Sequence, residues 1–143
     1  MTRTIALGVT MLAIAAAHGA PSGKTVKSHD GVCQASVPAT WDTSAGFGLA
    51  YSRDQMSSIA VTTPEHANSF NDAKENAKKS NPDLRVIKNT ATEFEMYSLP
   101  AGRPHMSRSI PVAGGKFCTV DVFYRGLTVD DAHNIAETLK SAK

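Results

Sequence analysis

Residues 92–125 decide the fold, and they read TEFEMYSLPAGRPHMSRSIPVAGGKFCTVDVFYR. Three runs rich in β-branched and aromatic residues, Thr92–Leu99, Arg103–Val112 and Phe117–Arg125, are separated by proline- and glycine-containing segments. Runs of this kind, interrupted by short turn sequences, predict consecutive strands joined as hairpins. The stretch therefore predicts an antiparallel β-meander at the centre of the domain.

The two connections also predict a register for the meander. Pro100-Ala101-Gly102 suits a three-residue hairpin loop, and Gly114-Gly115 suits a two-residue turn. Counting back from these turns places Arg108 opposite Asp121. Successive side chains alternate between the two faces of a sheet, so the register divides the apolar residues between the faces. One face should carry Phe94, Met96, Met106, Ile110, Val112, Phe117 and Phe123, and the other Cys118, Val120, Val122, Tyr97 and Tyr124.

The segments on either side add strands and two helices. Thr128 and Asp131 form a capping-box pattern ahead of apolar residues at helical spacing, which predicts a closing helix. Both faces of the meander are partly apolar, so we expect an α+β fold, an antiparallel β-sheet flanked by helices in an α/β/α layering. The other expected elements are strands at Gly31–Val37, Gly46–Ser52, Ser57–Thr63 and Leu84–Asn89, and a helix at Ser69–Lys79.

The first residues follow the order of a secretory signal peptide. Arg3 precedes an apolar run over residues 5–17, which is shorter than the about 20 residues that a membrane-spanning helix needs. Small residues suit cleavage after Gly19 or Ala17. We therefore expect a signal peptide at 1–19, a flexible mature N-terminus at 20–29, one domain at 30–143, and a periplasmic or secreted protein without a membrane anchor.

The two cysteines fit this destination. Cys33 and Cys118 are an even pair in a chain bound for an oxidising compartment, where free thiols are rare. We expect them to form a disulfide bond. The alternative is a pair of free thiols, one of them nucleophilic.

Composition narrows the class of partner. Hydrophobic residues make up 41% of the chain and charged residues 20%, which is typical of a folded globular domain. The formal net charge is +2, without the basic surplus of nucleic-acid-binding domains. We therefore expect a protein partner and no nucleic acid.

The order of elements resembles the PsbP/Mog-type domain family. The resemblance rests on the strand that ends in Val37-Pro38-Ala39-Thr40-Trp41, followed by a hairpin, a helix, a meander and a closing helix. It implies an antiparallel sheet between helices and a binding role, such as that of an accessory subunit, an adaptor or a chaperone. It carries no catalytic residues over to this chain.

One histidine row invites a catalytic interpretation. The predicted register aligns Tyr97, His105 and Tyr124 across neighbouring strands, with Ser107 and Ser109 further along the face of His105. A histidine beside a serine is the core of a nucleophilic hydrolase, but no Gly-x-Ser-x-Gly elbow is present. We favour a polar and aromatic cross-strand ladder that supports a binding surface.

Two charged pairs have simple structural interpretations. Arg108 and Asp121, opposite each other in the predicted register, are expected to form a structural ion pair, with an anion clamp as the alternative. His133 and Glu137 lie four positions apart on the closing helix and could supply two metal ligands. Two ligands do not make a site, so we expect an exposed pair and neither a metal nor a cofactor.

Together these features predict an exported, non-enzymatic protein-binding domain of the bacterial periplasm or cell envelope, such as an immunity-type inhibitor or an adaptor. The alternatives are a small secreted hydrolase using His105 with Ser107 or Ser109, and a small-ligand carrier with a pocket between sheet and helix. The candidate binding surface comprises Trp41, Arg53, Asp54, Tyr97, Arg103, His105 and Tyr124.

Overall fold

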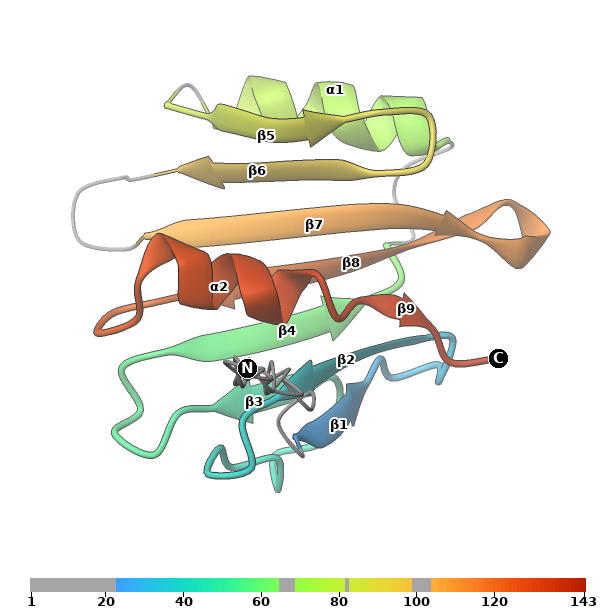
Figure 1. Cartoon of the computed structure of the whole chain (residues 1–143). Helices are drawn as coiled ribbons and strands as arrows, with labels where there is room; N and C mark the ends of the chain where they lie inside the picture. The colour runs from blue at the N-terminus through green and yellow to red at the C-terminus, as the bar shows by residue number, and fades with distance from the viewer. Residues whose placement is uncertain (1–22, 65–68, 82, 99–103) are drawn as a thin grey trace, which may run out of the picture.

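A computed structural model describes residues 23–64, 69–81, 83–98 and 104–143 (Figure 1). Within these residues the chain forms two antiparallel sheets and two α-helices, so the expected α+β class is confirmed. The expected signal peptide at 1–19 lies outside the described residues.

The larger sheet has six strands in the order β3-β4-β8-β7-β6-β5, and all its pairs are antiparallel. It contains the predicted meander, with the predicted hairpin added at one side. The strands are β3 (Leu49–Tyr51), β4 (Ser58–Thr62), β5 (Arg85–Asn89), β6 (Phe94–Ser98), β7 (His105–Val112) and β8 (Lys116–Phe123).

A smaller sheet of three strands was not predicted. It consists of β1 (Lys24–Lys27), β2 (Cys33–Val37) and β9 (Lys140–Ser141), in the order β1-β2-β9. The expectation of a flexible segment at 20–29 is therefore wrong for β1, which pairs along its whole length with β2. The polar composition of this stretch was misleading: Val26 is buried, and Lys24 Nζ donates to the carbonyl oxygen of Trp41 at 2.7 Å.

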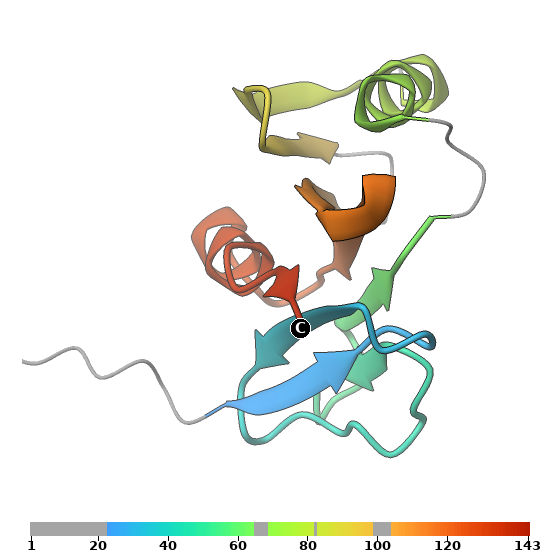
Figure 2. The same ribbon diagram turned by 90° about the vertical axis from the view of Figure 1, so that its right-hand side faces the viewer.

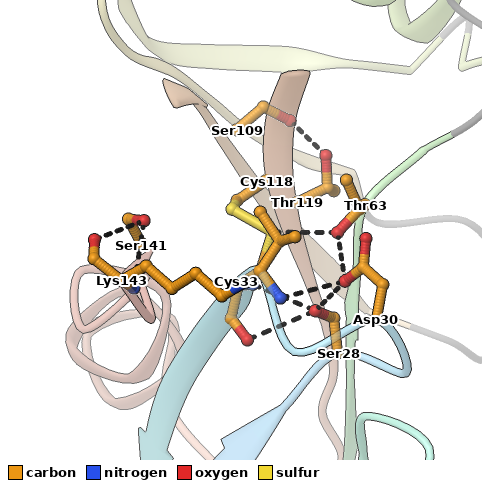
Figure 3. The surroundings of a disulfide bond; sticks show 10 residues. Ser28, Asp30, Cys33, Thr63, Ser109, Cys118, Thr119, Ser141 and Lys143 are labelled. Carbon is orange, nitrogen blue, oxygen red and sulfur yellow. Dashed lines mark hydrogen bonds between the residues drawn. A yellow bond between two sulfur atoms is a disulfide. The ribbon is translucent and has the colours of Figure 1, made fainter. Parts of the chain in front are cut away.

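The disulfide between Cys33 and Cys118 joins the two sheets (Figure 3). It connects β2 to β8 across a sequence separation of 85 residues, and both cysteines are fully buried. The hydroxyl of Thr63, at the end of β4, lies 3.2 Å from Cys33 Sγ and donates a hydrogen bond to Asp30. The predicted disulfide is confirmed.

Both predicted helices are present. In α1 (Phe70–Ser80), the Ser69 side chain accepts a hydrogen bond from the backbone N–H of Asp72. In α2 (Val129–Ala136), Thr128 and Asp131 form a complete reciprocal capping box. The two helices lie on opposite faces of the six-stranded sheet (Figure 2), which we call the α1 face and the α2 face.

The register of the meander differs from the prediction by one residue. Arg108 lies opposite Val120, and Asp121 lies opposite Ser107. A three-residue turn over Ala113–Gly115, η1, causes the shift, because Gly114 and Gly115 both adopt positive φ and Val112 then pairs with Lys116. The β6–β7 pairing shifts likewise, since Ser98 pairs with His105.

A shift of one residue exchanges the faces of a strand. Met106, Ile110 and Val112 therefore share the α2 face with Cys118, Val120 and Val122. The α1 face keeps Phe94, Met96 and Phe117 but also carries His105, Ser107, Ser109 and Asp121. The predicted division of apolar side chains was thus wrong for β7.

The main core lies on the α2 face, between the six-stranded sheet, α2 and the small sheet. Ile59, Val61 and Met106 contribute from the large sheet, Ala35 and Val37 from β2, and Ala132, Ala136 and Leu139 from the C-terminal segment. The start of β3 closes on β4 at Gly48, where a Cβ atom would lie 2.2 Å from the carbonyl oxygen of Val61. Only glycine fits this close approach.

Candidate functional site

The loop between β3 and β4 is held by its own side chains. Ser52 Oγ donates to Asp54 Oδ1 at 2.6 Å, and Asp54 Oδ1 also accepts from the backbone N–H of Met56 at 3.0 Å. Ser52 Oγ in turn accepts from the N–H of Ser57 at 2.9 Å. The hydrogen bonds that Asp54 accepts hold the pKa of its carboxyl below the ordinary value, and the bond from Ser52 has the largest effect. The loop therefore has a fixed shape in the free protein.

A second set of bonds fixes the position of this loop on the sheet. Ser57 is buried, and its hydroxyl donates to the carbonyl oxygen of Arg125 at 2.9 Å. The same hydroxyl accepts from the N–H of Arg125 at 3.1 Å. The β3–β4 loop is thereby attached to the segment that follows β8, although the two lie 68 residues apart in sequence.

Large side chains are exposed around this loop. Tyr51, Met56 and Phe123 have exposed fractions of 36%, 51% and 38%. They border a hollow of about 430 Å³, and a second hollow of about 300 Å³ adjoins it through Tyr51 and Gln55. We call the surface formed by Tyr51, Arg53, Gln55, Met56 and Phe123 the partner surface.

The predicted binding residues divide between this surface and the core. Arg53 and Asp54 are exposed on the β3–β4 loop, as expected. Trp41 and Tyr124, with exposed fractions of 3% and 4%, belong to the core, although Tyr124 also lines the first hollow and Trp41 the second. Tyr97 is half-buried on the α2 face, packed against the core. Arg103 lies outside the described residues.

His105 lies on the α1 face in a row different from the predicted one. Its strand neighbours are Ser98 and Phe123, and its ring stacks on Phe123 with centroids 4.7 Å apart. Its Nε2 atom is 2.9 Å from Asp121 Oδ1, a carboxylate that sequence reasoning placed on the other side of the sheet. The one-residue shift in register therefore creates a histidine–aspartate pair and removes the predicted ladder of Tyr97, His105 and Tyr124.

The serines that sequence reasoning placed near His105 share its face. Ser109 is bonded to Thr119 at 2.8 Å. In a serine hydrolase, the ring nitrogen away from the carboxylate must reach the serine hydroxyl. Here Asp121 takes Nε2, the outer nitrogen, and no hydrogen bond joins His105 to a serine among the described residues. The arrangement lacks the contact that would activate a nucleophile.

Arg108 lies on the α2 face in a cluster of charges. The expected pair with Asp121 is wrong, because the two residues lie on opposite faces. Instead, Arg108 Nη1 is 3.0 Å from Glu95 Oε2 and 3.3 Å from Glu137 Oε1, and Nη2 is 3.1 Å from Glu93 Oε1. Glu95 is completely buried, so Arg108 supplies the cation that makes its burial tolerable.

The same cluster contains His133, which was expected to be exposed with Glu137. Its Nδ1 atom contacts Glu95 Oε1, and its Nε2 atom lies 3.6 Å from Glu137 Oε1. Ligand atoms of Glu95, His133 and Glu137 lie within 4.8 Å of one another, which is close enough to surround a metal ion. Arg108, however, already contacts both carboxylates. We interpret the cluster as an ion network under α2.

Glu95 is the residue of this cluster that sequence reasoning missed. It stands between Phe94 and Met96 in β6, a pattern typical of a strand with one solvent-exposed face. No signal in the sequence pointed to it, because the predicted register had already paired Arg108 with Asp121. With the correct register, Glu95 and Arg108 are direct cross-strand partners.

Comparison with known proteins shows a shared fold and no family. No protein-family description matches the sequence, and no curated protein matches it. A crystal structure from Bacteroides thetaiotaomicron VPI-5482, at 1.50 Å resolution, is similar to this chain with 21% identity and a TM-score of 0.51. The match covers 85% of this chain but 49% of that protein, so the chain spans about half its length.

These comparisons leave the PsbP/Mog-type resemblance a prediction. Within the described part of the chain, neither helix is long and apolar enough to cross a membrane. The similarity to the Bacteroides structure supports the α+β architecture of this chain.

Proposed function

We propose that this protein is an exported, non-enzymatic protein-binding domain of the bacterial periplasm or cell envelope, acting as an immunity-type inhibitor or an adaptor. The observation that carries the proposal is the β3–β4 loop, which its own hydrogen bonds hold in place beside exposed Tyr51 and Phe123. A loop already fixed in its binding shape loses little conformational entropy when a partner docks.

Two features support the compartment. A buried disulfide that joins two sheets is typical of proteins that fold in an oxidising environment. The first nineteen residues have the order of a signal peptide: a basic residue, an apolar run and small residues at the cleavage positions.

The partner surface favours a partner of particular chemistry. Tyrosine, phenylalanine, methionine and arginine are enriched at protein interfaces, and the surface offers all four. Oδ1 of Asp54 accepts from Ser52 and from the Met56 N–H, and Arg53 forms no ion pair with any described residue. We therefore expect the partner to present an apolar patch with at least one carboxylate beside it.

Affinity capture from an envelope fraction of the source organism tests the proposal. The disulfide-intact protein should retain a specific partner, and Arg53→Glu and Met56→Glu should each weaken its retention at least about tenfold. Ile87→Thr is the control, because Ile87 is also an exposed apolar residue (43%, against 51% for Met56) but lies on β5, away from the partner surface. Equal retention by all variants would contradict the proposed surface.

The captured partner then separates an inhibitor from an adaptor. If the partner is an enzyme, the wild-type protein should lower its activity in a purified assay and Met56→Glu should not. An adaptor would instead leave the activity unchanged and join the enzyme to a third component, which would be seen as a larger complex by size-exclusion chromatography.

The hydrolase alternative has one favourable observation, the contact between His105 and Asp121 next to Ser107. Hydrolysis of general ester and peptide substrates by the purified protein, lost in His105→Ala, would overturn the binding proposal. We expect no turnover above background, because Asp121 uses the outer nitrogen of the His105 ring.

A further inference from the structure

A groove of about 310 Å³ lies between α1 and the α1 face of the large sheet. Ala73, Asn76 and Ala77 of α1 form one wall. The floor is formed by side chains of β6, β7 and β8, including Met96, Ser107, Phe117 and Asp121. The groove is separate from the hollows of the partner surface, with which it shares no lining residue.

Ser107 is the unusual residue of the floor. It is only 7% exposed, yet its hydroxyl makes no hydrogen bond with any described residue. Its Oγ atom is not fully buried, because the only buried side-chain oxygens without a partner among the described residues are Ser98 Oγ and the Tyr124 hydroxyl. Ser107 lines the groove, so its hydroxyl is open to it and is free to bond a ligand there.

The neighbours of Ser107 define what this ligand could be. Asp121 lies directly opposite it on β8, with one carboxylate oxygen bonded to His105 and the other without a described partner. A carboxylate accepts hydrogen bonds, and a serine hydroxyl both donates and accepts, so together they suit hydroxyl groups. Apolar surface from Met96, Phe117 and Ala73 lies beside these polar groups.

The charges that line the groove and the volume of the groove further limit the class of ligand. No lysine or arginine is among the described residues that line the groove, so nothing there would balance an anionic ligand. Asp121 already has a hydrogen-bond partner in His105. The volume is at the lower end of the range for small-molecule sites.

We propose that this groove binds a neutral, hydroxyl-rich small molecule about the size of a monosaccharide. Ser107 and Asp121 contact its hydroxyl groups, and Met96 and Phe117 cover its carbon–hydrogen surface. This activity is independent of the partner surface and does not rest on the protein-binding proposal.

Saturation-transfer difference NMR on the disulfide-intact protein tests the groove. The probes are glucose, galactose and mannose as neutral sugars, glucuronate as an anion and glucosamine as a cation. We expect transfer to at least one neutral sugar and less to its charged counterparts. Ser107→Ala should weaken binding about three- to tenfold by removing one hydrogen bond, and Ala73→Phe should abolish it by filling the groove.

Met56→Ala is the control, because Met56 belongs to the partner surface and should leave sugar binding unchanged. Thermal melts of each variant check that the fold is intact, and Ser107→Ala removes no hydrogen bond from it. Two results would overturn the proposal: no transfer to any neutral sugar, which would mean a groove filled by water only, or transfer that survives Ala73→Phe. Transfer to glucosamine but to no neutral sugar would also overturn the proposal, and it would identify a site for amines.

Discussion

The two faces of the six-stranded sheet differ in how they are covered. On the α2 face, a helix and a second sheet bury a continuous apolar core, and a disulfide holds the layers together. On the α1 face, Lys74 is the only buried residue of α1. The helix is attached mainly by Phe70, whose ring lies 6.1 Å from that of Phe117, and by Lys74, which donates to Asn89 and to the carbonyl oxygen of Thr90.

This difference suggests that the two faces of the sheet have different roles, one in stability and the other in binding. Buried apolar area supplies most of the free energy of folding, so stability should come from the α2 face. The α1 face, with its polar floor and loosely attached helix, is left free for binding. Mutations on the two faces should therefore have very different effects on stability, and four predictions test this.

Loss of the disulfide should have the largest effect. Replacing Cys33 and Cys118 together by alanine frees a loop of 85 residues, which should cost about 4 kcal/mol of unfolding free energy. Urea unfolding of the double variant measures the cost, and the wild-type protein with a reductant should behave alike. A loss below about 1 kcal/mol would show that the sheets pack together without the covalent link.

Arg108→Met should cost about 3 kcal/mol, because it removes the guanidinium that pairs with the buried Glu95 carboxylate. The double variant Arg108→Met with Glu95→Gln should recover part of this loss, since the buried charge is then gone. Urea unfolding of the single and double variants gives the coupling energy between the two residues. Equal stability of the single and double variants would argue against a buried ion network.

Truncation of one side chain from each helix compares the two faces directly. Ile135→Ala in α2 should cost about 2 kcal/mol, because Ile135 is 7% exposed and packs in the core. Phe70→Ala in α1 should cost about 1 kcal/mol or less, although it removes a larger side chain, because Phe70 is only half-buried. Thermal denaturation measures both, and a larger loss for Phe70→Ala would reverse the comparison.

The smallest expected effect is a dependence on pH at the start of α2. Hydrogen bonds from the backbone N–H and the side chain of Thr128 hold the pKa of Asp131 below its ordinary value of 3.8. A carboxyl whose pKa is lower in the folded state stabilises the fold above the unfolded pKa, and this contribution is lost as the pH falls through the folded pKa.

Unfolding free energy measured at pH values from about 6 down to about 3 should therefore decrease, and the decrease should be smaller in Asp131→Asn. Asp130→Asn is the matched control, because Asp130 is the neighbouring carboxylate on the same turn but is not the capping residue. An identical pH profile for wild type and Asp131→Asn would show that the cap contributes nothing measurable.

Much of the secondary structure could be predicted from the sequence. Local signals were sufficient for the capping box of α2, for the Ser69 cap of α1 and for the hairpin between β3 and β4. The disulfide followed from the number of cysteines and the expected compartment. These features depend on few residues or on simple chemistry.

The register could not be predicted, and the candidate site depended on it. Gly114-Gly115 suits a two-residue turn equally well, and nothing local shows that Ala113 joins the turn. The error of one residue moved Asp121 away from His105 and Arg108 away from Glu95. The small sheet was missed for a different reason: β1 and β9 are short polar edge strands whose pairing with β2 is determined by tertiary structure.

The pairing of β9 with β2 also has consequences for how the chain folds. β9 pairs with residues of β2 that lie more than 100 positions earlier in the sequence. The disulfide likewise joins cysteines 85 positions apart, so it can form only after most of the domain has been made. Folding dominated by such distant contacts is slow. In a chain that emerges N-terminus first, β1 can cover one edge of β2 early, but the other edge stays exposed until β9 appears. During that interval the chain should depend on chaperones to avoid aggregation.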